Sequence, residues 1–196
     1  RDVERSRGLG DVYKRQVLGS HYGSYDFKLS YTEKDWAAHV YYQHYFNDKS
    51  GMEFANKTDG LWGVQFDLPF LPWLNKVVAE YLVTMNQSGP IHFIIFDRDK
   101  WQGGRGGGND DYYNNGEYTT GFSYFNRGIG SPLIPAPEYN SDGSLGFKNN
   151  RVKSWHFAAE GDINTQLSYR ILFTAMNGWG TSYFPFLNKK FGTSSL

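Results

Sequence analysis

One stretch of the sequence combines flat aromatic rings with charged and amide side chains. It covers residues 86–115 and reads NQSGPIHFIIFDRDKWQGGRGGGNDDYYNN. A sugar ring has an apolar face that stacks on an aromatic ring and a polar rim that forms hydrogen bonds with amides and carboxylates. We therefore predict contact with a polyhydroxylated ligand here. The candidate ligand residues are Trp101, Arg105, Asp110, Asp111, Tyr112, Tyr113, Asn114 and Asn115.

The same stretch has a second interpretation, in which the loop packs its own aromatic rings against each other. The two interpretations are compatible, because some rings can pack while others remain free for a ligand. At about thirty residues, the loop is far longer than the two to five residues that join ordinary hairpin strands. A connection of that length is usually functional.

Other kinds of chemistry are not favoured by the residue types. The glycines around Arg105 lack the G-K-[ST] ending of a phosphate-binding loop. The NSDG sequence at Asn140 offers oxygen donors, but Arg151 stands where a calcium-binding EF-hand needs glutamate. The five histidines form no HExxH pair, and there is no G-x-S-x-G motif. We expect no catalytic residue, no metal site and no cofactor, and hence a protein that is not an enzyme.

The composition points to an all-β chain. Tyr and Phe number 15 each and Trp 6 among 196 residues, and aromatic side chains favour strands. There is no cysteine, so disulfides and thiolate metal sites are excluded. The 20 basic and 20 acidic residues balance, which gives no electrostatic basis for binding nucleic acid.

Alternation of apolar and polar side chains predicts the strands that position the long loop. One or two further short strands are expected within 117–130, and residues 177–196 read as another loop rich in glycine and aromatics. The predicted main strands cover residues 24–31, 36–46, 61–68, 77–85, 151–163 and 167–176.

Short turns alternate with long loops along this series of strands, as they do in outer-membrane barrels. The apolar faces carry Trp and Tyr near the strand ends, as aromatic belts do, whereas sandwich cores are mainly aliphatic. The predicted fold class is thus all-β, a fragment of a large antiparallel transmembrane β-barrel. The opposite faces would line the lumen as a network of paired charges. These lumenal side chains are Asp26, Lys28, His39, Gln43, Gln65, Asp67, Glu80, His156, Glu160, Asp162 and Arg170.

The first sixteen residues differ from the rest. They contain five basic and three acidic residues with no periodicity, and their DVYKRQ string resembles translated sequencing-adapter sequence. We interpret 1–16 as a non-native segment. Residues 17–196 are expected to be a partial outer-membrane β-barrel with long extracellular loops, missing residues at both ends.

Four motifs, in order, resemble the Wzi-type capsule assembly family of Bacteroidetes-like bacteria. They are YLVTMNQSGP, GGNDDYYNN, GIGSPL and FKNNRVKSWHFAAEGDI, and the similarity spans about residues 18–180. The resemblance implies a monomeric barrel of about eighteen strands in the outer membrane. It also implies a surface lectin that holds capsular polysaccharide on the cell without covalent chemistry.

The sequence therefore predicts a protein of the cell outer membrane that binds and organises surface, or capsular, polysaccharide. Its expected partners are that polysaccharide and outer-membrane lipid. One alternative is a porin-like channel for sugars or small solutes. Another is a soluble β-sandwich module that binds carbohydrate. A channel would conduct ions through an open lumen, and a soluble module would fold without detergent.

Overall fold

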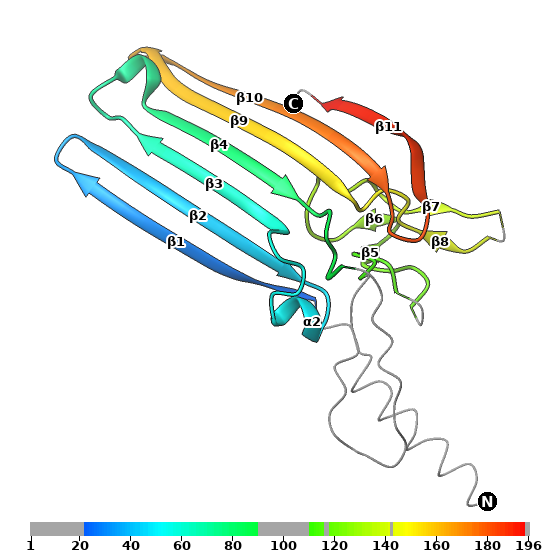
Figure 1. The fold of residues 1–196 in the computed structure, drawn as a ribbon. Coiled ribbons are helices and arrows are strands. Elements are labelled where there is room, and N and C mark those ends of the chain that lie inside the picture. Colours follow the sequence, from blue (N-terminus) through cyan, green and yellow to red (C-terminus); the bar gives the residue numbers. More distant parts are fainter. Residues whose placement is uncertain (1–21, 90–109, 116–117, 142, 195–196) are drawn as a thin grey trace, which may run out of the picture.

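A single antiparallel sheet dominates the computed structural model, which describes residues 22–89, 110–115, 118–141 and 143–194. The sheet has seven strands in the order β1-β2-β3-β4-β9-β10-β11 (Figure 1). Every neighbouring pair is antiparallel. The strands are β1 (Gly23–Glu33), β2 (Trp36–Phe46), β3 (Gly60–Asp67), β4 (Lys76–Val83), β9 (Val152–Asn164), β10 (Leu167–Gly180) and β11 (Pro185–Ser194).

The remaining elements are short. They are the helical turn α2 (Lys49–Met52), the 3₁₀ helix η1 (Pro72–Leu74), and the paired strands β5 (Ser123–Tyr124) with β6 (Arg127–Gly128) and β7 (Glu138–Tyr139) with β8 (Leu145–Gly146). None of the helices in the described ranges has the length and apolar character needed to cross a lipid bilayer.

The all-β prediction is confirmed, and most predicted strands match observed ones within a few residues. The described part of the sheet is open, with β1 and β11 at its two edges. The prediction for residues 177–196 was wrong, because β10 continues to Gly180 and β11 pairs with it. A bulge between Gly178 and Gly180 interrupts that pairing. Pro185 stands at the start of an edge strand, a position that tolerates proline.

One face of the sheet is apolar across the strands β1, β2, β3, β4, β9 and β10. The registers place Leu29, Val40, Val64, Ala79 and Phe157 in a single row across five strands. The rows on either side of this one are aromatic or aliphatic as well. Leu29 remains 76% exposed, and many other large apolar side chains on this face are exposed too. The described residues therefore leave a broad apolar surface uncovered.

The opposite face is polar and its charges are paired. One row consists of Asp67, Lys76, Glu160 and Arg170 on four adjacent strands. Lys76 Nζ lies 3.1 Å from Glu160 Oε1, and Arg170 Nε donates to Glu160 Oε2 at 2.9 Å. The His39 ring bonds to Asp67 at 2.9 Å. The predicted network of paired charges on one face is confirmed at these positions.

Candidate functional site

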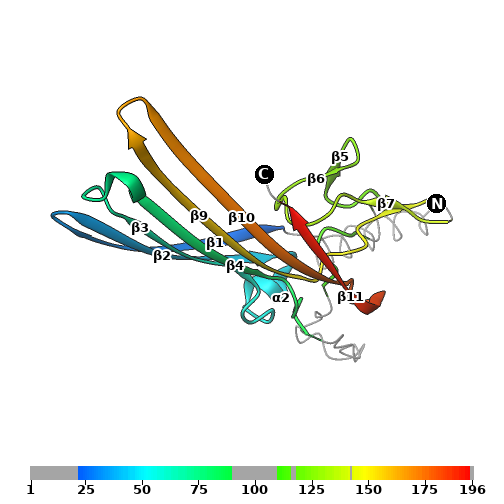
Figure 2. The same cartoon turned by 90° about the horizontal axis from the view of Figure 1, so that it is seen from above.

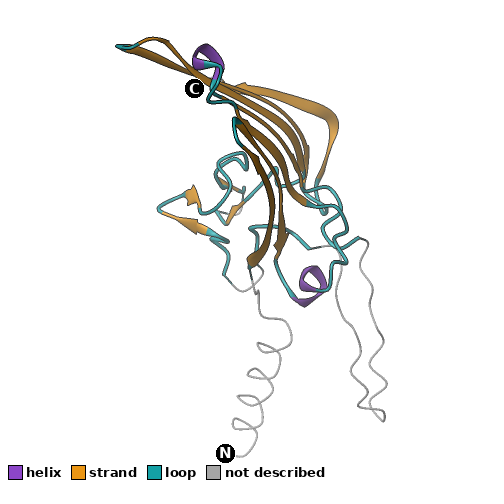
Figure 3. Ribbon diagram, turned by 90° about the vertical axis from the view of Figure 1, so that its left-hand side faces the viewer, coloured by secondary structure: helices purple, strands orange, loops and turns teal. Residues whose placement is uncertain are grey.

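The two longest connections lie at one end of the sheet. They are residues 47–59 and the segment between β4 and β9, and residues 181–184 join β10 to β11 at the same end; the β1–β2 and β9–β10 turns and the connection with η1 lie at the other end (Figure 1). Seen nearly edge on, the sheet curves, and the described residues of the 110–150 segment lie on its concave side (Figures 2 and 3). We call this region the loop end.

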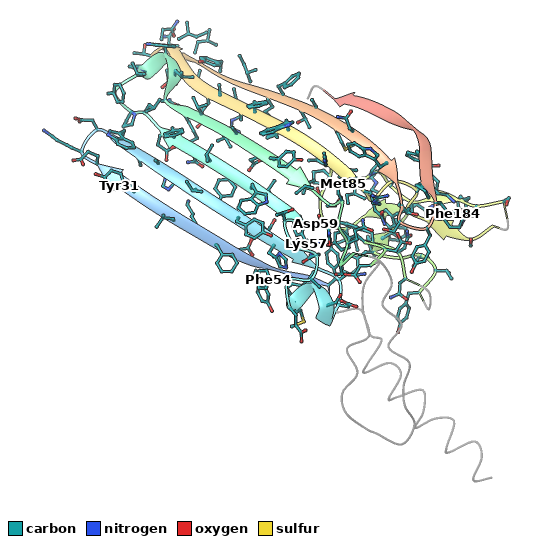
Figure 4. The ribbon with its side chains drawn as sticks, viewed as in Figure 1. Tyr31, Phe54, Lys57, Asp59, Met85 and Phe184 are labelled. Carbon is teal, nitrogen blue, oxygen red and sulfur yellow. The ribbon has the colours of Figure 1, made fainter. Side chains whose placement is uncertain are left out.

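Asp59 is the hub of a buried hydrogen-bond network at the loop end. Its carboxylate accepts hydrogen bonds from the backbone N–H groups of Met85, Asn86 and Gln87 at 2.8 to 3.0 Å. The hydroxyl of Tyr112 donates to the same carboxylate at 3.3 Å. Asp59 and Met85 lie side by side where the sheet meets the loops (Figure 4). One side chain thus fixes the path of the chain after β4 and the position of Tyr112.

Two amides, on Gln87 and Asn150, join the two ends of the long connection. Gln87 Nε2 donates to the backbone and side-chain oxygens of Asn150 at 3.2 Å. Asn150 Nδ2 in turn donates to Asp111 Oδ1 at 2.6 Å and to the backbone oxygen of Tyr112 at 2.7 Å. Thr84 completes the junction, since its hydroxyl donates to the Asn150 oxygen and accepts from Val152 N–H. These contacts give Gln87 of NQSGP and Asn150 of KNNR a structural role.

Several of the predicted ligand residues are part of this buried packing. Tyr112 is 2% and Tyr113 5% exposed, and both form a small core with Ile134 and Phe147. Tyr113 accepts a hydrogen bond from Ser131 N–H. The side-chain amide of Asn114 donates to the backbone oxygen of Phe147 and accepts from its backbone N–H, so it pairs with Phe147 as the backbone of a neighbouring strand would. The packing interpretation therefore holds for these rings, while their contact with sugar stays a prediction.

The other predicted ligand residues either flank these rings in the same turn or lie outside the described ranges. Asp110 accepts a hydrogen bond from Ser88 Oγ at 2.6 Å, and Asp111 binds the Asn150 and Asn114 amides. Asn115 Oδ1 accepts from the N–H of Tyr118. Trp101 and Arg105 lie outside the described residues. The structure brings Asp110 to Asn115 together as one packed turn.

An exposed aromatic group that sequence reasoning missed follows this turn. Tyr124 pairs with Arg127, so Phe125 and Asn126 form a two-residue turn with φ of 46° and 60°. Asn-Gly normally occupies such a turn, because a bulky residue at positive φ is strained. Phe125 is nevertheless 82% exposed, edge-on to the ring of Tyr124 at 4.6 Å. Tyr118 and Tyr139 are exposed in the same segment. The signal in the sequence was the unusual turn Tyr-Phe-Asn-Arg.

Burial raises the pKa of the three carboxyl groups in the network. For Asp59 and Asp111, loss of solvent outweighs the hydrogen bonds that they accept, and each pKa lies above the ordinary value. Burial also raises the pKa of Asp110 to about 6, with a smaller contribution from the charge of Asp48, against the hydrogen bond from Ser88. Burial therefore disfavours the charged form of each of these carboxyl groups, as expected for buried acids.

This shift predicts a pH-dependent stability that the substitution Asp110→Asn removes. The folded pKa exceeds the unfolded value of 3.8. The contribution of Asp110 to the free energy of unfolding is therefore largest below about pH 4. It decreases as the pH rises to about 6 and is constant above that. Relative to Asp110→Asn, the wild type should lose about 3 kcal/mol across this window. Thermal unfolding at several pH values measures the difference, with exposed Asp35→Asn as control. Parallel pH profiles for all three proteins would contradict the assignment.

No family model matches the chain, and no curated protein or solved structure matches it either. The fold on its own defines an antiparallel all-β protein with a two-faced sheet and one end covered by packed loops.

Proposed function

We propose that the chain forms part of the wall of an outer-membrane β-barrel that binds and organises surface polysaccharide. This is the function that the resemblance to the Wzi-type capsule assembly family implies. The observation that carries the proposal is the two-faced sheet: one face apolar and exposed, the other polar with paired charges. In a barrel wall the apolar face meets lipid and the polar face meets the lumen.

The exposed apolar face supports a lipid environment in particular. Soluble proteins rarely leave a contiguous apolar patch of more than a few hundred Å² uncovered. Here apolar side chains are exposed along β1, β3, β9 and β10, which extends the patch over most of the sheet. Lipid covers such a surface without any complementary shape, whereas a sandwich partner would need a second matching sheet.

The loop end supports polymer binding rather than free diffusion. Described residues of the 110–150 segment lie on the concave side of the sheet (Figure 3). Buried hydrogen bonds from Tyr112 to Asp59 and from Ser88 to Asp110 tie them to the chain next to β3 and β4. These residues would fill part of a lumen. The rings of Tyr118, Tyr124, Phe125 and Tyr139 are exposed in that segment. Stacking of successive sugar units on separate rings gives many weak contacts, which together hold a long polymer through avidity.

Titration with polysaccharide tests the proposal. The protein in detergent or bilayers should bind the surface polysaccharide of the producing cells saturably. The change Tyr124→Ala/Phe125→Ala should weaken binding about tenfold, because each stacking contact contributes roughly 0.5–1.5 kcal/mol. It should leave the unfolding temperature unchanged, because both rings are exposed. The matched control Phe70→Ala removes an exposed ring from the β3–η1 connection, at the opposite end of the sheet, and should bind polymer normally.

The porin-like channel is the alternative, and planar-bilayer recording separates it from the lectin. A lectin with a filled lumen shows little conductance and saturable polymer binding. Steady ion conductance with no polymer binding by the folded protein would overturn the proposal in favour of the channel.

A further inference from the structure

A cavity of about 600 Å³ lies between the polar face of the sheet and the 110–150 segment. Its floor includes Gln43, Glu80, His156 and Thr174 from four strands, and Gly130 to Leu133 line it on the loop side. Pockets for small ligands usually have volumes of about 300–1,000 Å³. This cavity is separate from the exposed rings of the β5–β6 turn. Among the described residues predicted to contact the ligand, Tyr113 lines it.

The floor of the cavity offers unused hydrogen-bonding capacity. Glu80 accepts a hydrogen bond from the hydroxyl of Tyr41. Its carboxylate has roughly four acceptor positions, and in the described part of the chain it forms no ion pair. His156 Nδ1 pairs with the Thr174 hydroxyl at 2.5 Å, and its other ring nitrogen has no described partner. Ser154, which also lines the cavity, is 1% exposed, and its hydroxyl has no partner among the described residues.

Aromatic and apolar groups form the other walls. Tyr22, Tyr45 and Tyr113 line the cavity together with Leu82 and Pro132. The rings of Tyr22 and Tyr113 are tilted against each other with centroids 5.3 Å apart. A ligand here would meet flat apolar surface on one side and a carboxylate, an imidazole and an amide on the other.

The negative charge of Glu80 favours a neutral ligand over an acidic one. No Lys or Arg is among its described lining residues, whereas Glu80 is. An acidic sugar would therefore bring its carboxylate towards that of Glu80 without a compensating cation. The vicinal hydroxyls of a neutral sugar can donate to the Glu80 oxygens while its ring lies against tyrosine.

We propose that this cavity binds a neutral mono- or disaccharide beneath the loops. The proposal rests on the proposed function in taking carbohydrate as the ligand class, and deepens it by adding a selective site to the exposed stacking surface. The exposed rings would hold the polymer non-selectively, and the cavity would select a neutral unit or chain end.

Calorimetric titration of the whole protein in detergent tests the site. The probes are neutral mono- to trisaccharides released by partial hydrolysis of the producing cells' surface polysaccharide, with glucuronic acid as the charge contrast. Glu80→Gln keeps the shape but removes the charge, and should weaken binding about tenfold because hydrogen bonds to charged groups are the stronger ones. Ser24→Trp should abolish binding by filling the cavity from β1. Thr32→Trp lies on the same strand and face outside the cavity, and should bind as the wild type does.

The outcomes separate this proposal from the general one. Weaker neutral-sugar binding in Glu80→Gln and Ser24→Trp, with Thr32→Trp normal and glucuronic acid unbound, supports the cavity. Equal binding by all four proteins, or polymer binding with no binding of the small saccharides, overturns the cavity and leaves the polysaccharide function standing. If the folded protein binds neither saccharide nor polymer, both proposals fail.

Discussion

Replacing Asp59 with alanine is expected to destabilise the loop end by about 3–5 kcal/mol. The substitution leaves the N–H groups of Met85, Asn86 and Gln87 without their acceptor, together with the Tyr112 hydroxyl. Of these four donors, those of Gln87 and Tyr112 belong to buried residues. Each buried donor left unpaired costs about 1–3 kcal/mol. Asp59→Asn keeps one acceptor oxygen and should be intermediate. Thermal unfolding followed by circular dichroism measures the loss, and limited proteolysis shows whether the 110–151 segment opens first.

Asp35→Ala is the matched control for this prediction, because Asp35 lies exposed in the turn between β1 and β2. Its unfolding temperature and cleavage pattern should match the wild type. If Asp59→Ala behaves like Asp35→Ala, the carboxylate does not hold the loops, and the path of the chain after β4 must be fixed by the Gln87 and Asn150 amides alone.

An arginine at Leu29 is expected to block stable insertion into a bilayer, whereas an arginine at the next residue is not. Leu29 lies within β1 on the apolar face, and Ser30 lies beside it on the polar face. A charge on the lipid face near the middle of a barrel strand costs about 2–4 kcal/mol, while lumenal positions tolerate charge. Folding into lipid vesicles, measured by protease protection and by the shift between folded and unfolded bands in electrophoresis, compares Leu29→Arg with Ser30→Arg.

The difference between Leu29→Arg and Ser30→Arg tests whether the apolar face meets lipid. If the two arginine variants insert equally well, or if the wild type is monomeric and folded in water without detergent, the apolar face does not meet lipid. A soluble β-sandwich would then be the better reading of the alternation.

The sheet could be predicted from the sequence because each strand residue faces one of two sides. The alternation in 36–46 gave the bounds of β2, and that in 77–85 gave the face of Val77, Ala79 and Tyr81. β11 was missed because glycine, proline and lysine interrupt its pattern, and because an edge strand is set by its neighbour's backbone as much as by its own side chains.

The contacts at the loop end could not be predicted from the alternation of side chains. Asp59 and Tyr112 are 53 positions apart, and no periodicity connects them. The residue types Tyr, Asn and Asp suit both a sugar site and a buried hydrogen-bond network, and only the burial of Tyr112 and Asn150 separates the two. Gln87, Asp111 and Asn150 come from three of the four motifs that carried the family resemblance, and their side chains are held in this network.

The junction of β4 with β9 has a consequence for how the chain folds. The hairpins β1–β2 and β9–β10 close over very short turns, but Thr84 and Val152 meet across 68 positions. Closing a loop of that length costs about 3 kcal/mol more in chain entropy than closing a two-residue turn. We therefore expect the strands β1 to β4 and the strands β9 to β11 to pair separately. The pairing of β4 with β9 would then form late in folding. The hydrogen bonds among Thr84, Gln87, Asn150 and Val152 then offset the chain entropy that is lost when β4 pairs with β9.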